Sequence, residues 1–130
     1  MNYTANPDAI TREYFDSLLL ETRYIDSVLP TTKMTLFGEE FDTPIMTAAL
    51  SHLDKTASNG MGVYAQGAKL SNAVHWMGMG EDEELERVVA TGARTIKIIK
   101  PHADNKEVFR KIEHAVANGC FAVGMDTDHA

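Results

Sequence analysis

Four short apolar runs constrain the fold of this chain more than any other feature. Short, nearly continuous apolar runs are typical of strands that are covered on both faces of a parallel sheet. Helical patterns fill the gaps between the runs, so strands and helices alternate along the chain. We therefore predict an α/β fold with about four parallel strands and flanking helices. The four runs are residues 44–50, 73–77, 95–100 and 121–126.

Three helices are expected between these runs. The clearest takes Asp104 as its N-cap, with Glu107 as the partner in a capping box, and ends at Gly119. A second helix is expected over 82–90 and a weaker one over 62–70. One apolar stripe of the clearest helix should pack on the sheet. The stripe consists of Val108, Phe109, Ile112, Ala115 and Val116.

The segment before the first run has a different pattern. A helix is expected over 12–23, and residues 35–41 alternate around Gly38, which predicts a small hairpin. Residues 51–60 show no periodicity and follow the first expected strand, so they are a candidate active-site loop. We expect one domain made of a helical segment, a hairpin and four strand–helix units, at 1–34, 35–43 and 44–130.

Length and charge narrow the classes of function. The chain has 130 residues, of which 44% are hydrophobic, enough for one domain with a buried core. Its formal charge of −7 argues against binding to nucleic acid or to anionic membranes. The single cysteine, Cys120, allows no internal disulfide. There is no long apolar stretch and the first residues are polar, so we expect a cytoplasmic protein without a membrane span.

The last run suggests a carboxylate at the rim of a site. Its larger side chains, at 121, 123 and 125, should pack beneath the helices, because alternate residues of a strand face opposite sides. Asp126 then lies on the other side at the carboxyl tip, where active sites of parallel α/β proteins are found. A solvated strand-end aspartate is the alternative. Gly124 leaves room for a flat group or marks a bulge.

Three other side chains are candidates from their strand positions. Lys97 and Lys100 lie on opposite faces of their run, and an outward packing of Ile96 and Ile98 would point Lys97 inward. Either ammonium group could approach an electron-rich ligand, or each could extend along the surface to reach solvent. His75 is expected at the end of its strand, where a histidine hydrogen-bonded within the fold is the alternative to a site residue.

Motifs for metals and phosphates are weak. The five histidines show no metal-ligand spacing, and residues 126–129, with two aspartates and a histidine, form only a short pattern. The chain has no Walker loop, dinucleotide fingerprint or nucleophile elbow. We therefore predict no metal site.

The order of several segments carries a family resemblance. These are Arg23 with the hairpin after it, then PIMTAA at 44–49, EEL at 83–85 before ATG at 90–92, and AVGMDT at 122–127. In this order the chain resembles the FMN-dependent α-hydroxy-acid oxidase and dehydrogenase family over roughly residues 12–130. The resemblance implies the N-terminal half of a (β/α)8 TIM barrel, with FMN at the carboxyl ends of the strands.

The resemblance also implies roles for residues along the first strands. The backbone of Ala48, Ala49 and Leu50 would lie beside the flavin. His75 falls near a position where the family usually has a flavin-contacting serine, and Gly124 replaces a common threonine.

Two further positions follow from the same resemblance. Lys97 or Lys100 falls in the strand where the family has a glutamine and a tyrosine near flavin and substrate. Asp126 matches the family's carboxylate, which orients the catalytic histidine and stabilises its charge. The family's N-terminal substrate-contacting tyrosine has no counterpart in this chain.

The implied reaction is hydride transfer from a small 2-hydroxy acid to flavin N5, with a histidine as base. The family's catalytic histidine, flavin-binding lysine, substrate arginine and phosphate loops belong to the second half of the barrel. We therefore predict that the isolated chain is inactive and that its open sheet edges allow self-association. Two alternatives remain. One is a non-enzymatic α/β module that binds a ligand or partner, and the other is a fragment of a different phosphate- or flavin-binding barrel, such as a nucleotide dehydrogenase or isomerase relative.

Overall fold

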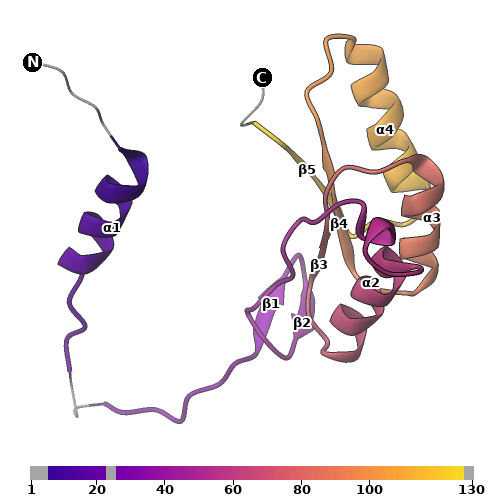
Figure 1. The fold of residues 1–130 in the computed structure, drawn as a ribbon. Helices are drawn as coiled ribbons and strands as arrows, with labels where there is room; N and C mark the ends of the chain where they lie inside the picture. Colours follow the sequence, from indigo (N-terminus) through magenta and orange to yellow (C-terminus); the bar gives the residue numbers. More distant parts are fainter. Residues whose placement is uncertain (1–5, 23–25, 128–130) are drawn as a thin grey trace, which may run out of the picture. The chain divides into compact units, whose positions relative to one another are not determined.

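A computed structural model describes residues 6–22 and 26–127 of the chain (Figure 1). They fall into two compact units, Met1–Thr31 and Thr32–Ala130. The first contains helix α1, Pro7–Ser17, whose N-cap Asn6 accepts hydrogen bonds from the N–H groups of Asp8 and Ala9. The predicted bounds of 12–23 are wrong, because the Asn6 cap with proline next to it starts the helix earlier and Leu18 is already extended. Arg23 lies outside the described residues.

The second unit opens with the predicted hairpin. Strands β1, Met34–Leu36, and β2, Glu39–Phe41, pair in antiparallel register, which confirms the prediction. Phe37 and Gly38 both have positive φ, 49° and 85°, as a tight two-residue turn between twisted strands requires.

A three-stranded parallel sheet forms the centre of the second unit. Its strands are β3, His75–Met77, β4, Thr95–Ile99, and β5, Ala122–Met125, in the order β3-β4-β5. Three of the four apolar runs therefore form parallel strands, as predicted.

The first apolar run, 44–50, is not a regular strand. It lies beside β3, where the N–H of Thr47 donates to the carbonyl of Val74 and Leu50 forms an isolated parallel bridge with Met77. Between these points the N–H of Trp76 donates to the Thr47 hydroxyl instead of a carbonyl. The strand predicted at 44–50 is therefore only partly formed: the segment runs along the β3 edge of the sheet, but a side chain interrupts its ladder.

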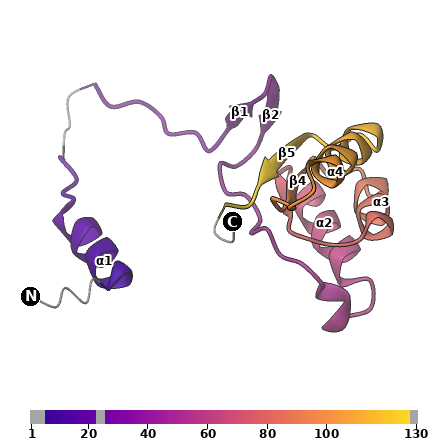
Figure 2. The ribbon, with the colours of Figure 1, turned by 90° about the horizontal axis from the view of Figure 1, so that it is seen from above.

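Three helices cover one face of the sheet and the hairpin lies on the other side (Figure 2). They are α2, Gly60–Leu70, α3, Asp82–Ala90, and α4, Asn105–Ala117, and a short 3₁₀ turn covers Leu53–Lys55. Gly92 and Gly119, each with a φ of +79°, end α3 and α4. These helices match the predicted ones within two residues at each end. None of the described helices is long and apolar enough to cross a membrane.

The sheet separates two apolar cores. On the helix side, Met77 packs with side chains of the three helices, including Ala65, Leu85 and Ala115. On the hairpin side, Ile96 packs with Val74 and Phe41. Because strand residues alternate, the two cores assign every side chain of β3 and β4 to one face or the other.

Two apolar sets are more exposed than expected. In α4, Val108 and Ala115 are buried, but Phe109 and Val116 are 63% and 65% exposed. In β5, Val123 and Met125 pair with Lys97 and Ile99 and so face the helix side as predicted, but they are exposed, and the expectation that helices cover them is wrong. No described helix follows β5, so nothing in the described part of the chain covers this flank.

Candidate functional site

A cavity of about 410 Å³ lies at the carboxyl ends of the parallel strands. This is the edge at which parallel α/β proteins bind their ligands. Its walls come from the end of the first run, from the turn after β3, from β4 and from the end of β5. The lining residues are Ala49, Ser51, Gly78, Met79, Ile98, Met125, Asp126 and Thr127.

Gly78 holds two walls of the cavity in close contact. Its N–H donates to the carbonyl of Leu50 at 2.8 Å. A Cβ atom at this position would lie 2.4 Å from the Ser51 hydroxyl oxygen and 2.6 Å from the Ala49 carbonyl oxygen. Only a residue without a side chain fits there, so the glycine sets the distance between the two loops.

Asp126 lies at the tip of β5, as predicted. Its backbone N–H donates to the carbonyl of Ile99 at 3.0 Å, which continues the ladder one residue beyond the strand. The residue is half-buried and lines the cavity beside Thr127. A carboxylate therefore stands at the rim that the parallel strands share.

Of the other residues predicted beside the flavin, only Ala49 is among the lining residues of this cavity in the described part of the chain. Ala49 is in its wall, and the Leu50 carbonyl accepts the Gly78 N–H at its edge. The carbonyl of Ala48 accepts a hydrogen bond from the hydroxyl of Tyr64, in α2, at 3.1 Å. The space that Gly124 leaves is filled by Ile98, whose Cδ1 would lie 2.8 Å from an added Cβ.

His75 lies on the helix side of the sheet and begins β3 rather than ending it. Its Nδ1 is 3.2 Å from the Thr95 hydroxyl, and its ring meets the ring of Tyr64 edge-on. The side chain is fully buried, and this burial lowers the pKa of His75 to about 4. This placement matches the alternative of a histidine bonded within the fold, and His75 is not among the lining residues of the cavity.

Lys97 points toward the helices, opposite to the predicted direction. Ile96 belongs to the hairpin-side core, so the parity of β4 puts Lys97 on the helix side. Its Nζ donates to the carbonyl of Gly78 at 2.5 Å. Burial lowers the pKa of Lys97 to about 8.

A second cavity, of about 420 Å³, lies next to the first and shares Met79 and Ile98 with it. Both predicted lysines, Lys97 and Lys100, line it. The structure therefore brings them to a neighbouring pocket rather than to the cavity that contains Asp126.

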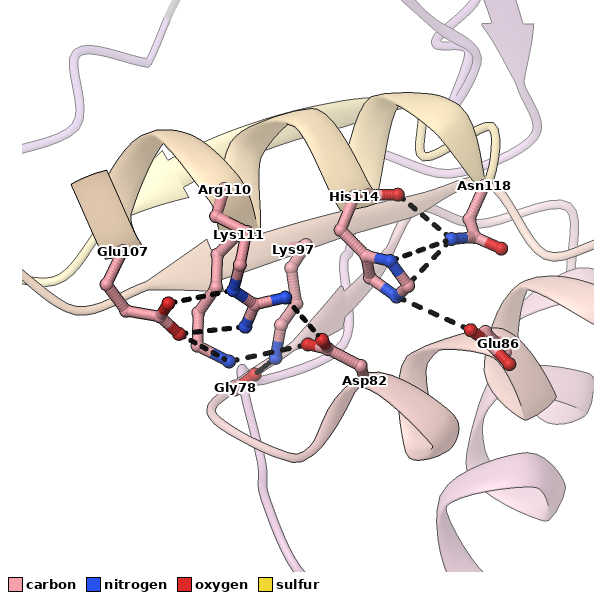
Figure 3. Close-up of polar contacts among 9 residues, drawn as sticks. All are labelled: Gly78, Asp82, Glu86, Lys97, Glu107, Arg110, Lys111, His114 and Asn118. Carbon is pink, nitrogen blue, oxygen red and sulfur yellow. Dashed lines mark hydrogen bonds and ion pairs between the residues drawn. The ribbon is translucent and has the colours of Figure 1, made fainter.

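Ion pairs join α3 to α4 beside these pockets (Figure 3). Asp82 lies between Arg110, at 2.6 Å, and Lys111, at 3.4 Å. The Glu107 carboxylate accepts from Arg110 at 2.7 Å, while the Asp104 side chain caps α4 by accepting from the N–H of Lys106. The hydrogen bonds from Arg110 lower the pKa of both Asp82 and Glu107, so both carboxylates stay charged. The Asp82 pairs link α3 to α4, whereas the Glu107 pairs lie within α4.

Ser51 belongs to the segment 51–60, which was predicted as a candidate active-site loop, and it lines the cavity. Met79 and Ile98 were not predicted as site residues: Met79 lies in a loop without a periodic pattern, and Ile98 was expected to pack outward. Alternation along β4 divides its side chains into two sets but does not say which set faces the helices. Assigning Ile98 to the side away from the helices would have identified it as a residue of the cavity. Among the described residues no three His, Cys, Asp or Glu side chains come together as metal ligands, and residues 128–129 of the acidic pattern lie outside them.

Comparisons with known proteins relate this chain to a protein family and to solved structures. The profile of the FMN-dependent dehydrogenase family matches residues 6–130. A search of curated proteins finds no match. Among solved structures, mandelate oxidase with 3,3-difluoro-2-hydroxy-3-phenylpropionic acid is similar, with a TM-score of 0.77 and 20% identity over 93% of this chain and 37% of that one.

Two further structures of mandelate oxidase are similar to this chain in fold. Mandelate oxidase itself has a TM-score of 0.72 and 20% identity over 86% of this chain and 32% of that one. A mutant with a monooxide FMN adduct has a TM-score of 0.68 and 21% identity over 73% and 30%. The chain thus spans about a third of the length of these oxidases, and the likeness confirms the predicted fold.

The match over almost the whole sequence shows that the chain belongs to the FMN-dependent dehydrogenase family. The predicted family and its cofactor, FMN, are thereby confirmed.

Proposed function

We propose that this chain supplies part of the cofactor and substrate site of an enzyme that oxidises a small 2-hydroxy acid. One observation carries the proposal: Asp126, Ala49 and Gly78 line one cavity at the carboxyl ends of the parallel strands. The solved oxidases with this fold are named for mandelate, a 2-hydroxy acid. FMN, when bound, supplies the redox chemistry by accepting two electrons from the substrate.

The residues of the cavity fit a flat, partly apolar group. Ala49 and Gly78 leave no bulky side chain at the wall, and Met79, Ile98 and Met125 give it apolar surface. Clefts of this size with a few polar groups are typical of small-molecule sites. Ala49, Ser51 and Gly78 would hold the cofactor on one side, with Asp126 at the opposite rim.

Asp126 is proposed to orient a histidine base. A carboxylate beside an imidazole selects its tautomer and stabilises its charged form. Within residues 6–22 and 26–127, the side chains that line the cavity include no histidine. We therefore propose that the 130-residue chain alone does not oxidise a 2-hydroxy acid, and a turnover assay with the purified chain tests this.

Flavin binding tests the cavity directly. Titrating the chain into FMN should quench flavin fluorescence in a saturable way. Gly78→Ala should weaken binding roughly tenfold or more, because its Cβ would push the 49–51 loop out of place. Gly67→Ala is the matched control, since a Cβ there meets nothing within 4 Å. Absence of saturable binding, with a cooperative thermal transition, would instead favour the non-enzymatic module.

The role of Asp126 can be tested only in a catalytically complete protein that contains this chain. Asp126→Asn should lower kcat by roughly 10² to 10⁴-fold, because an amide cannot stabilise the charged histidine. KM for the hydroxy acid should change little, because Asp126 is not proposed to bind the substrate. An unchanged kcat would contradict the proposed role, and flavin absorbance of the variant controls for loss of cofactor.

A further inference from the structure

Lys97 is a charged side chain buried in the interior of the fold, where an apolar side chain would be expected. It is 6% exposed and lies on the helix side of β4, where its neighbours along the strand, Thr95 and Ile99, are also buried. Burying an ammonium group is costly unless it is bonded and paired. Its nitrogen donates a hydrogen bond to the carbonyl of Gly78 (Figure 3).

That acceptor belongs to the turn between β3 and α3, residues 78–80. One side of this turn is held by the 49–51 loop, through the bond from the Gly78 N–H to Leu50. The other side meets the helix layer. There the Glu84 carboxylate lies so close to Gly80 that an added Cβ would overlap with it. Lys97 reaches this turn from β4, on the helix side of the sheet.

The turn also forms the partition between the two cavities. Gly78 lines the cavity that contains Asp126, and Gly80 lines the neighbouring one. Met79, between them, lines both. A small movement of the 78–80 turn would therefore change the shape of the proposed cofactor cavity.

We propose that Lys97 is a positioning residue that holds the 78–80 turn in place for the cofactor, through its hydrogen bond to the Gly78 carbonyl. The inference rests on the proposed function, because it takes the cavity beside this turn as the FMN site. Lys97 itself does not touch that cavity, so its effect is transmitted through the backbone of Gly78.

The charged groups around Lys97 decide how it can be tested. Glu84 and Asp82 face it from α3, Lys111 faces it from α4, and Cys120 lies beside it after α4. One oxygen of the Glu84 carboxylate is buried without a hydrogen-bond partner. Removal of Lys97 alone would take a cation away from the surroundings of this carboxylate, so a variant that also neutralises position 84 is needed.

The experiment compares four variants of the chain. Lys97→Met, and Lys97→Met with Glu84→Gln, should bind FMN roughly tenfold more weakly, the effect of one lost hydrogen bond from a charged donor. Lys97→Arg should restore most of the affinity, because it can still donate to the carbonyl. Lys111→Met is the control, since it removes a nearby cation that pairs with Asp82 and Glu107 instead of the Gly78 carbonyl.

A second measurement needs no flavin. Hydrogen exchange of the Gly78 amide should become faster in Lys97→Met than in the parent chain, while amides of α4 keep their rates. In the parent chain the Met79 and Gly80 amide shifts should titrate with a midpoint near the lowered pKa of Lys97, about 8. This titration should be absent from Lys97→Met.

The outcomes separate the two proposals. If the parent chain binds no FMN, the proposed function fails, and the exchange of the Gly78 amide still decides whether Lys97 holds the turn. If Lys97→Met binds FMN with parental affinity, the positioning role is overturned, whatever the exchange rates are. Unchanged exchange at Gly78 would overturn it too.

Discussion

At the scale of single residues, buried polar groups are the features that make this fold sensitive to pH. His75 is fully buried beneath α2, bonded to Thr95 through one ring nitrogen. Its other nitrogen, Nε2, is buried without a partner. A proton on this ring would add an unpaired charge to the interior, so the folded state keeps the histidine neutral.

This leads to a prediction about acid stability. The pKa of His75 is about 4 in the folded chain, below its ordinary value of 6.5, so the unfolded chain binds more protons between these values. The contribution of His75 is therefore complete above 6.5 and is lost as the pH falls toward 4. His75→Phe should reduce the fall in unfolding free energy over this window, measured by urea denaturation.

The control for this prediction is the exposed His102, which faces solvent. His102→Ala removes a histidine from an exposed position, so it tests whether the effect belongs to the buried ring. An equal slope in His75→Phe and the parent would contradict the proposed cause.

At the scale of elements, helix α4 shows how local signals set a boundary. The Asp104 carboxylate accepts from the N–H of Lys106, which satisfies one of the free donors at the helix start. Glu107 was predicted to complete a capping box, but its carboxylate accepts from Arg110. The cap on this helix therefore depends on Asp104.

Replacement of the Asp104 cap should lower the stability of the folded chain measurably. Asp104→Ala is expected to lower the free energy of unfolding by about 1 kcal/mol, because it leaves a helix donor without its acceptor. Asp104→Asn keeps an acceptor and should cost much less. Urea denaturation of the two variants tests this, and equal stability of Asp104→Ala and the parent would refute it.

At the scale of the whole molecule, one flank of the second unit is apolar and uncovered. Phe109 and Val116 of α4 and Val123 and Met125 of β5 are exposed, and β5 is at the edge of its sheet. A strand edge next to exposed apolar side chains is a site for pairing with another chain.

Self-association of the purified chain should depend on this flank. We predict that the chain forms dimers or larger species at high concentration and that Val123→Lys reduces them, because a charge on an edge strand opposes pairing. Val63→Lys places the same charge on an exposed apolar position of α2 and is the control. Sedimentation velocity measures the effect, and identical distributions for Val123→Lys and the parent would argue against this surface.

Some residues of the candidate site could be predicted from the sequence and others could not. Asp126 could be placed at the rim because an apolar run that ends in a carboxylate marks the carboxyl tip of a strand. Lys97 was assigned to the wrong face, because alternation along β4 separates its side chains into two sets but does not identify which set meets the helices. Gly78 gave no signal at all, since its role depends on Ser51 and Ala49, which are distant in sequence.

The sequence alone determined the order of strands and helices, the hairpin turn and the ends of α3 and α4. These depend on neighbours within a few residues: apolar period, a capping carboxylate and glycines with positive φ. Only the tertiary structure decided that residues 44–50 form an interrupted edge, that Lys97 lies under the helices and that Gly78 closes the cavity wall. These depend on contacts between segments far apart in the chain, which no local pattern records.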